Sequence, residues 1–363
     1  MTRRVFNFGP GPATLPLPVL ERARDEFLDF QGIGASIIEI SHRSREFEAL
    51  LDQTDALLRE LMEIPQDYAI LYAHGGGQMQ FSMVPLNLMG YRPARKGLYI
   101  ETGEFSKRAI EEAQRYGTVH VVATSRDTRF DRIPEFDAEG VDPAASYLHI
   151  TTNNTICGTQ WRAFPKLSTV PLVGDATSEI LSRRIDVRRF GVLYAGAQKN
   201  LGPAGLAVVI VRRDLLGHAL PETPKLLNYK VLADDHSLTN TTNTFSVYMS
   251  KLVLEWLKAE GGVAALEERN QRKAALLYEV IDASAFYRGH AHKPDRSMMN
   301  VTFNLPTPEL EGRFLREAEA QGLYALKGHR VLGGVRASLY NAMGEDGVRA
   351  LAEFMRAFEQ RNG

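Results

Sequence analysis

The sequence predicts an α/β fold, with a large domain built on a mostly parallel sheet and a smaller α+β domain. Short apolar runs alternate with segments of helical apolar spacing between residues 68 and 211, which is the pattern of strands connected by helices. From residue 247 onward, long helical patterns dominate and the strands become few and short. We therefore expect a large domain over residues 15–256, and a small domain formed by residues 257–363 together with the N-terminal residues 1–14.

The expected elements follow from apolar spacing and turn residues. Proline and glycine in Asn7-Phe8-Gly9-Pro10-Gly11-Pro12 predict an extended arm that packs against the small domain. In the large domain, helical spacing predicts helices over 19–30, 46–62, 78–88 and 105–116. Short apolar runs predict strands over 68–72, 98–101, 119–123, 147–151, 171–175, 192–195 and 206–211. From residue 247 onward, the same criteria predict helices over 247–259, 263–281, 308–320 and 345–359, and strands over 297–305, 323–326 and 335–339.

Composition narrows the possible functions. The 363 residues include 43 basic and 44 acidic side chains, so the net charge of −1 offers no broad basic field for nucleic acid. The single cysteine, Cys157, cannot form an intramolecular disulfide or a multi-cysteine metal site, and we expect no metal. No apolar run has the length of a membrane span, and residues 5–8 are too short for the core of a signal peptide. We therefore expect a cytoplasmic protein without a membrane partner.

Lys199 is the residue on which the expected chemistry depends. It lies in a glycine-containing loop between the apolar runs 192–195 and 206–211. Burial of a lysine lowers its pKa and makes the amine a better nucleophile towards carbonyl groups. An aldehyde cofactor held as a Schiff base is the natural use of such an amine. A loop lysine without a chemical role is the alternative.

Asp175 is the expected partner of this lysine. It ends the apolar run 171–175 and precedes Lys199 by 199 − 175 = 24 positions. If the two runs are parallel strands joined by a crossover, both side chains lie at the sheet edge where ligands bind in α/β proteins. A carboxylate there can keep a pyridine nitrogen protonated, as pyridoxal phosphate requires. A helix cap is the alternative role for this aspartate.

Three further stretches carry groups that bind anions or small ligands. His74-Gly75-Gly76-Gly77 joins a strand to a helix, where bare backbone N–H groups and the helix dipole attract a phosphate. Thr152-Asn153-Asn154-Thr155 follows a strand end and is rich in hydrogen-bonding groups. Lys327-Gly328-His329-Arg330 and Arg336 flank a pair of glycines, and arginine binds carboxylate or phosphate through two parallel hydrogen bonds. An ordinary turn or a solvated loop is the alternative for each stretch.

Four stretches together resemble the phosphoserine aminotransferase family, a branch of the class V pyridoxal-phosphate-dependent aminotransferases. They are Asn7-Phe8-Gly9-Pro10-Gly11-Pro12, Glu39-Ile40-Ser41-His42-Arg43, Tyr194-Ala195-Gly196-Ala197-Gln198-Lys199-Asn200 with Gly202-Pro203-Ala204-Gly205, and Ala325-Leu326-Lys327-Gly328-His329-Arg330. These matches span nearly the whole chain. The resemblance implies the aspartate-aminotransferase-like fold, pyridoxal 5′-phosphate as cofactor, and a homodimer with shared active sites.

The resemblance also implies roles for individual residues. Lys199 would hold the cofactor as a Schiff base, and Asp175 would hold its pyridine nitrogen. The other cofactor contacts would be Gly77, Gln78 and Gln198 at the phosphate, Phe105 on the ring, Thr155 at the ring's O3′, and Asn240 and Thr241 at the phosphate in the other subunit. The acidic groups of the substrate would be bound by Arg43, His329, Arg330 and Arg336. Gln78 stands where the family often has arginine, and Phe105 where it often has tryptophan, so the backbone and the helix dipole must hold more of the phosphate charge.

The implied reaction transfers the amino group of L-glutamate to 3-phosphohydroxypyruvate and gives O-phospho-L-serine and 2-oxoglutarate, a step of serine biosynthesis. The family is also known to form 4-phosphohydroxy-L-threonine in pyridoxine biosynthesis. Two alternatives stay open. One is another class V pyridoxal-phosphate enzyme such as a cysteine desulfurase, for which Cys157 is the only available cysteine. The other is a non-catalytic phosphate-binding protein, which would leave Lys199 and Asp175 without a role.

Overall fold

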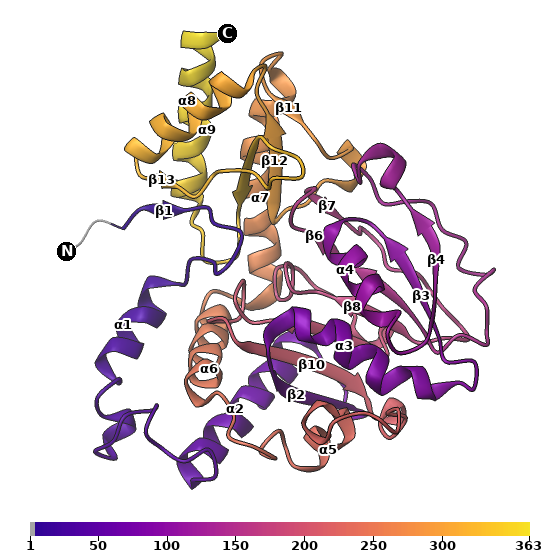
Figure 1. The fold of residues 1–363 in the computed structure, drawn as a ribbon. Helices are drawn as coiled ribbons and strands as arrows, with labels where there is room; N and C mark the ends of the chain where they lie inside the picture. The colour runs from indigo at the N-terminus through magenta and orange to yellow at the C-terminus, as the bar shows by residue number, and fades with distance from the viewer. Residues whose placement is uncertain (1–3) are drawn as a thin grey trace.

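The computed structural model describes residues 4–363 as two lobes, of which the larger contains a seven-stranded sheet (Figure 1). The strand order is β2-β10-β9-β8-β5-β3-β4, and within the described residues β10 alone runs antiparallel to its neighbours. The strands are β2 (Tyr68–His74), β3 (Lys96–Glu101), β4 (Thr118–Thr124), β5 (Tyr147–Thr151), β8 (Leu172–Asp175), β9 (Val192–Gly196) and β10 (Leu206–Arg212). This mostly parallel sheet confirms the predicted α/β class.

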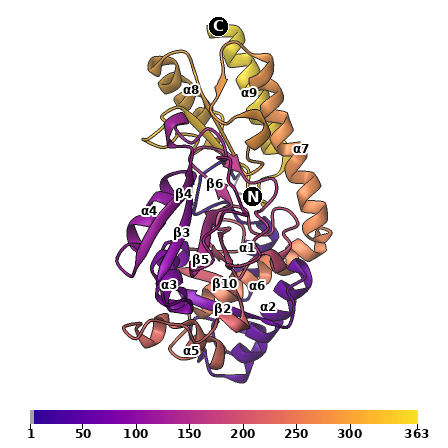
Figure 2. The ribbon, with the colours of Figure 1, turned by 90° about the vertical axis from the view of Figure 1, so that its right-hand side faces the viewer.

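Helices cover both faces of the sheet (Figure 2). One face packs against α1 (Leu17–Asp25), α2 (Arg45–Met62) and α6 (Thr244–Ala259), and the other against α3 (Gly76–Leu88), α4 (Glu104–Ala113) and α5 (Tyr229–Asp234). Along β10, alternate side chains enter the two apolar cores. Successive side chains of a strand point to opposite faces, so a strand covered on both sides must be apolar throughout. This explains the uninterrupted apolar runs in the sequence.

The small lobe has its own apolar core. Its antiparallel sheet contains β11 (Arg288–Gly289), β12 (Asn300–Asn304) and β14 (Val335–Ser338), and its helices are α7 (Gly262–Ala283), α8 (Pro308–Ala320) and α9 (Glu345–Asn362). Helix α7 belongs to both lobes, because Val263 and Leu266 enter a core of the large lobe whereas Leu277 and Ile281 enter that of the small lobe. A continuous helix therefore connects the lobes. The domain boundary near residue 256 stays a prediction.

The N-terminal arm crosses from one lobe to the other. Strand β1 (Phe6–Asn7) pairs in parallel with β13 (Leu323–Tyr324), and Phe8 is fully buried in the small-lobe core. Further along, the backbone N–H of Ala13 donates to the carbonyl of Gln198 at 2.8 Å in the large lobe. The arm thus contacts both lobes, and its assignment to the small domain stays a prediction.

Short elements complete the fold. The strands β6 (Asn153–Asn154) and β7 (Thr159–Gln160) form a small hairpin above β5. The 3₁₀ turns are Phe30–Gly32, Met89–Tyr91, Arg126–Thr128, Val187–Arg189, Arg213–Leu215, Lys225–Leu227 and Lys293–Asp295. Within residues 4–363, none of the helices is both long enough and apolar enough to cross a membrane.

Three expectations about elements differ from the structure. The first helix ends at Asp25 instead of continuing to residue 30, because the chain folds back and the N–H of Phe30 donates to the carbonyl of Ala35 at 2.8 Å. The strand expected over 297–305 is limited to Asn300–Asn304, since the Ser297 hydroxyl accepts hydrogen bonds from the N–H groups of residues 299 and 300. The strand expected over 323–326 is limited to Leu323–Tyr324.

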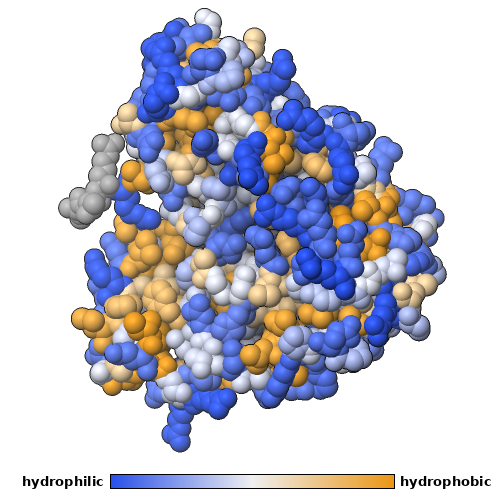
Figure 3. Space-filling model, viewed as in Figure 1, coloured by the Kyte–Doolittle hydropathy of each residue, from blue (hydrophilic) through white to orange (hydrophobic). Residues whose placement is uncertain are grey.

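Apolar side chains are exposed in the segment that follows α1. Leu28 is 82% exposed and Ile38 55%, and Phe27 and Ile33 are also exposed. The surface view shows a broad apolar area over this part of the molecule, at the lower left of Figure 3. Contiguous exposed apolar surface of this kind marks interaction sites in soluble proteins.

Candidate active site

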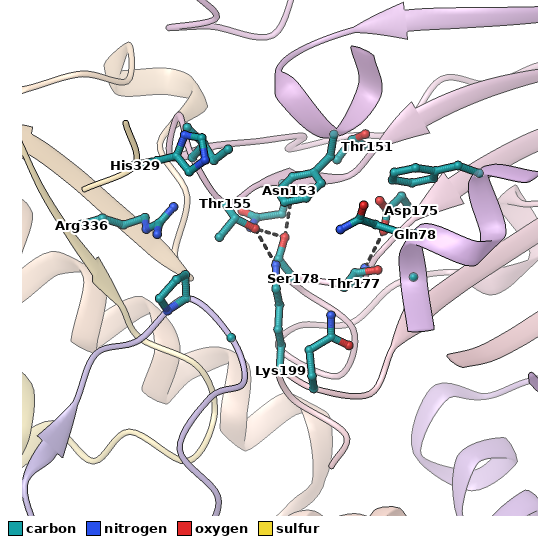
Figure 4. Close-up of a pocket in the computed structure, with 17 residues that line it drawn as sticks. Gln78, Thr151, Asn153, Thr155, Asp175, Thr177, Ser178, Lys199, His329 and Arg336 are labelled. Carbon is teal, nitrogen blue, oxygen red and sulfur yellow. Dashed lines mark hydrogen bonds between the residues drawn. The ribbon is translucent and has the colours of Figure 1, made fainter. Parts of the chain in front are cut away.

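A cavity of about 240 Å³ lies between the two lobes and the N-terminal arm (Figure 4). It is open to solvent, and it faces the carboxyl ends of β5, β8 and β9, which is where ligands bind in open α/β sheets. The lining residues are Pro10, Gly11, Gly77, Gln78, Phe81, Phe105, Thr151, Asn153, Thr155, Ile156, Asp175, Thr177, Ser178, Gln198, Lys199, His329 and Arg336. The structure thus brings most of the predicted site residues together.

Lys199 projects into the cavity from the loop that follows β9. The residue is only 8% exposed, and its Nζ donates to Oγ1 of Thr155 at 2.7 Å. The same amine lies 5.6 Å from the centre of the Phe105 ring. A Cβ at Gly11 would lie 3.4 Å from Cγ of Lys199, so the arm packs directly against the lysine side chain. The lysine is therefore held in one direction, with its amine in the cavity.

Asp175 ends β8, the strand beside β9 in the sheet. The two strands are parallel, with Asp175 opposite Tyr194, so Asp175 and Lys199 share the sheet edge as predicted. Burial raises the pKa of the Asp175 carboxyl above its ordinary value, while hydrogen bonds from Thr177 and the charge of Lys199 lower it. One of these bonds runs from the backbone N–H of Thr177 to Oδ1 at 3.0 Å. A cation placed beside Asp175 would stabilise the ionised form of its carboxylate.

The glycine turn between β2 and α3 forms another wall of the cavity. Gly75 and Gly76 have φ values of 85° and 67°, which favour glycine, and helix α3 begins at Gly76. A Cβ at Gly77 would lie 2.5 Å from Oγ1 of Thr177, so no side chain fits there. The N–H groups of a first helical turn have no partner within the helix. The backbone of this turn is therefore suited to binding an anion, and the phosphate contacts expected of Gly77 and Gln78 stay a prediction.

Phe105 and Gln198 complete the part of the cavity formed by the large lobe. Phe105 is the second residue of α4, whose start is fixed because Oγ of Ser106 accepts from the N–H groups of Thr102 at 2.9 Å and Gly103 at 3.0 Å. The side chain of Gln198 approaches the glycine turn, and its buried Oε1 has no hydrogen-bond partner within residues 4–363. A flat aromatic wall and a free amide are suited to holding a planar ring and a polar group.

Arg336 enters the cavity from β14 of the small lobe. The residue is 7% exposed, and within residues 4–363 its buried Nε has no hydrogen-bond partner. Burial lowers the pKa of the guanidinium below its ordinary value. Burial of an unpaired cation is unfavourable, and an anionic ligand in the cavity would relieve that cost.

His329 lies beside Arg336 in a tight loop. Residues 327 and 335 are paired across its base, and the N–H of Gly328 donates to the carbonyl of Gly334 at 2.9 Å. The N–H of Val331 donates to Nδ1 of His329 at 3.3 Å, so the neutral ring carries its proton on Nε2. Burial lowers the pKa of His329, and the charges of Arg336 and Arg330 lower it further. When neutral, His329 can therefore donate a hydrogen bond from Nε2.

Four predicted residues do not line this cavity. Arg43, Arg330 and Thr241 are exposed, and Asn240 is half-buried with its Nδ2 3.2 Å from Nε2 of His74. The roles expected for these four residues stay predictions.

Several lining residues were not among the predicted site residues. The hydroxyl of Thr177 accepts from the N–H of Gly196 at 3.1 Å, and the hydroxyl of Ser178 donates to the carbonyl of Asn153 at 2.7 Å. Both follow a strand-ending aspartate, and a polar pair at that position is the signal that could have identified them. Pro10 and Gly11 reach the cavity only because the arm crosses between the lobes, which no local pattern reveals.

Comparison with known proteins gives concordant results. Residues 5–351 match the family model described as aminotransferase class-V. The phosphoserine aminotransferase of Geobacillus kaustophilus is 50% identical over 360 residues, which are 99% of each chain. The solved structure of phosphoserine aminotransferase from Bacillus circulans subsp. alkalophilus has 42% identity and a TM-score of 0.96, with 99% of both chains covered. That of pyridoxal-phosphate-bound phosphoserine aminotransferase from Trichomonas vaginalis has 32% identity and a TM-score of 0.92, with 97% of this chain and 100% of that chain covered. These similarities confirm the resemblance noted in the sequence.

Proposed function

Because the chain belongs to the class-V aminotransferases, we propose that it uses pyridoxal 5′-phosphate to transfer the amino group of L-glutamate to 3-phosphohydroxypyruvate, giving O-phospho-L-serine and 2-oxoglutarate. The observation that carries this proposal is the placement of Asp175 and Lys199 at the carboxyl edge of neighbouring parallel strands, in one cavity with Arg336, whose buried Nε has no hydrogen-bond partner within residues 4–363 (Figure 4).

The residues of the cavity fit the cofactor. The side chain of Lys199 would hold its aldehyde carbon, Asp175 its pyridine nitrogen, and the start of α3 its phosphate. Two observations support this arrangement: the Asp175 carboxylate is buried within the cavity, and at Gly77 a Cβ has no room beside Thr177. When bound, the cofactor supplies an electron sink for the negative charge that develops at the substrate Cα.

Asp175 is suited to keeping a ring nitrogen protonated. Its carboxyl is buried, and burial alone raises its pKa. A cationic N–H beside the carboxyl would lower this pKa again, because an opposite charge at hydrogen-bond distance favours the ionised carboxylate. The N–H of Thr177 fixes the orientation of the carboxylate through Oδ1.

Lys199 is the group that moves the proton. Its Nζ can act as general base at the substrate Cα and then return a proton as general acid, provided that it lies within hydrogen-bond reach. The hydroxyl of Thr155 accepts from Nζ at 2.7 Å, and the arm residue Gly11 packs against the aliphatic part of the lysine. These contacts restrict the amine to the side of the cavity where the reacting carbon must lie.

Arg336 and His329 bind different acidic groups of the substrates. Both substrates carry a carboxylate beside the reacting carbon, and we assign it to Arg336, whose guanidinium is buried with an Nε that lacks a partner within residues 4–363. The distal group is a phosphate in one substrate and a carboxylate in the other. We assign this distal group to the Nε2–H of His329. Arg330 and Arg43 do not line the cavity within one chain, and we expect them to bind the same group from outside it. The phosphorylated substrate of pyridoxine biosynthesis carries the same two groups and would fit the same site.

We propose that the protein is a homodimer in which Asn240 and Thr241 reach the partner's cofactor phosphate. The exposed apolar segment after α1, with Leu28 82% exposed, supports an interface (Figure 3). A mixed dimer tests this arrangement. One chain carries Lys199→Ala, and the other carries both Asn240→Ala and Thr241→Ala. Such a dimer contains one intact site only if Asn240 and Thr241 contact the cofactor phosphate of the partner subunit. Full activity of a monomer would contradict the proposal.

A cysteine desulfurase is not favoured. Cys157 is 2% exposed and does not line the cavity, and burial raises the pKa of its thiol to about 12, so little thiolate forms near neutral pH. The free thiol suits a reducing compartment, and we propose the cytoplasm as the location.

Absorbance spectroscopy tests the function. The purified protein with pyridoxal phosphate should show the absorption of a lysine-bound cofactor, glutamate should change it, and 3-phosphohydroxypyruvate should restore it. The absence of a glutamate response would contradict transamination. Equal use of hydroxypyruvate and its phosphate would contradict the substrate assignment, because a site built for a distal anion must discriminate against its absence.

A further inference from the structure

A buried polar cluster connects the two lobes outside the cavity. It consists of Asn200, Asn270, Lys273 and Asn341, which are 4%, 0%, 0% and 3% exposed, and we call it the interlobe clamp. None of the four lines the cavity. Buried amide and ammonium groups are unfavourable unless they are hydrogen-bonded, and each of these four side chains makes hydrogen bonds, although Oδ1 of Asn270 has no partner within residues 4–363.

Asn341 is the centre of the interlobe clamp. Its backbone N–H donates to Oδ1 of Asn200 at 3.0 Å, and its Nδ2 donates to the carbonyl of Leu181 at 2.9 Å. Asn270 of α7 donates through Nδ2 to Oδ1 of Asn341 at 2.9 Å and to the carbonyl of Ser182 at 2.8 Å. Asn341, which follows the small-lobe sheet, is thus bonded to the large lobe both directly and through α7.

Lys273 fixes the turn that contains Asn341. Its Nζ donates to the carbonyls of Leu339 at 2.7 Å, Tyr340 at 3.0 Å and Met343 at 3.0 Å. An ammonium group has three donors, and these three carbonyls satisfy all of them without a carboxylate. The backbone carbonyls of the turn from residue 339 to residue 343 are therefore bonded to the Lys273 side chain of α7.

The interlobe clamp includes a neighbour of Lys199 in the sequence and a residue that shortly follows Arg336. Asn200 directly follows Lys199 in the chain, and Asn341 follows the strand β14 that carries Arg336. Leu181 lies at the end of the segment that begins at Asp175 and has a φ of 61°, which is unfavourable for a leucine. A residue in this conformation persists only where its surroundings hold it, and here the clamp bonds its carbonyl.

We propose that the interlobe clamp sets the separation between Arg336 and Lys199, so that Asn270, Lys273 and Asn341 are positioning residues for substrate binding. This inference rests on the proposed function, in which Arg336 binds the carboxylate attached to the carbon on which Lys199 acts. These two groups of the substrate are one bond apart, so the guanidinium and the amine must be placed together. A misplacement of about 1 Å can reduce the rate by roughly a hundredfold.

The alternative is that the cluster contributes to stability alone, and a matched control separates the two. Asn87 is 3% exposed, and its side chain makes three hydrogen bonds, to the carbonyls of Met83 and Leu227 and from the N–H of Tyr229, all within the large lobe. The side chains of Asn341 and Asn270 make two each, so Asn87→Ala should lower the unfolding temperature at least as much as Asn341→Ala or Asn270→Ala. It should leave the KM for both substrates unchanged.

The test compares these variants as holoenzymes. For Asn341→Ala and Asn270→Ala, we expect the KM for glutamate and for 3-phosphohydroxypyruvate to rise about tenfold or more, with cofactor content and cofactor absorbance unchanged. Calorimetric titration with 2-oxoglutarate should show the same loss of affinity without turnover. If the two variants only lose thermal stability, as Asn87→Ala does, and bind 2-oxoglutarate normally, the inference is overturned.

A milder variant keeps the test decisive where an alanine variant does not fold. Asn270→Ser removes both amide donors but retains a small polar side chain, and it should still weaken 2-oxoglutarate binding several-fold; normal binding would overturn the inference. The unmutated protein serves as the reference. Loss of its glutamate response would contradict the proposed function, whereas an intact response with unchanged KM in the variants contradicts only the role of the interlobe clamp.

Discussion

Replacing Arg336 with leucine should reduce activity without reducing stability. In the structure, the guanidinium is buried and its Nε has no hydrogen-bond partner within residues 4–363, and burial lowers its pKa. A buried cation without a counter-ion is unfavourable in the ligand-free protein, and the shorter, apolar leucine side chain removes that cost. We therefore expect the free energy of unfolding of Arg336→Leu to be unchanged or higher by up to about 2 kcal/mol.

Whereas the stability of Arg336→Leu should not fall, its catalytic activity should. A charge-assisted hydrogen bond to a substrate carboxylate contributes about 1.5–3 kcal/mol. Loss of a single bond of this kind lowers kcat/KM by about 10- to 160-fold, and loss of a bidentate pair lowers it further. Because both substrates carry the carboxylate beside the reacting carbon, both half-reactions should lose activity by similar factors.

Two measurements check this prediction. Denaturant unfolding of the cofactor-free protein gives the change in stability, and stopped-flow absorbance with each substrate in turn gives the two half-reactions. The reasoning would be refuted by a variant that keeps kcat/KM for both substrates, or by one that loses several kcal/mol of stability. A loss confined to the phosphorylated substrate would place Arg336 at the distal group instead.

The remaining predictions concern Lys199, Asp175 and His236. Lys199→Ala should lower the rate of transamination about 10³-fold or more while leaving the circular dichroism spectrum unchanged; comparable turnover would exclude it as the proton-transfer group. Asp175→Asn should retain the cofactor but lose about 100-fold in kcat, because an amide cannot stabilise a protonated pyridine nitrogen; full activity would make it only a structural residue. A hydrogen bond to Asp55 raises the pKa of His236 above its ordinary value of 6.5, so its stabilising effect is present in full below pH 6.5 and is lost as the pH rises through the higher folded-state pKa. The difference in melting temperature between wild type and His236→Gln should therefore shrink above pH 6.5, and a difference independent of pH would contradict this.

The pairing of Lys199 with Asp175 could be predicted because its signals are local. Each residue follows an apolar run short enough for a strand, and parallel strands place their carboxyl ends at one edge of the sheet. The anion-binding turn before α3 could be predicted in the same way, since adjacent glycines between a strand and a helix are typical of such a turn. The fold class followed from the same alternation of elements.

Other features depend on contacts that local patterns do not encode. The apolar spacing of residues 19–30 fits a single helix, because Phe30 would follow Ala23 by two turns on the same face. In the structure the chain bends after Asp25, and Phe30 still reaches the core, whereas Leu28 is exposed. Asn341 meets Asn200 across 141 positions of sequence, and each asparagine alone is compatible with any turn. Such long-range hydrogen bonds carry no periodic signal.

The pairing of β1 with β13 has a consequence for how the protein is made. Phe6 is opposite Leu323 in this pair, so 323 − 6 = 317 residues separate the addition of the two partners to the growing chain. At about 5–20 residues per second, roughly 15–65 s pass between the synthesis of the first strand and that of its partner. The seven-stranded sheet is complete at Arg212 and can form during that interval. A nascent chain arrested before residue 323 should therefore contain a folded sheet while its arm is still unpaired, and only release of the full-length polypeptide lets Gly11 and Arg336 close the site around Lys199.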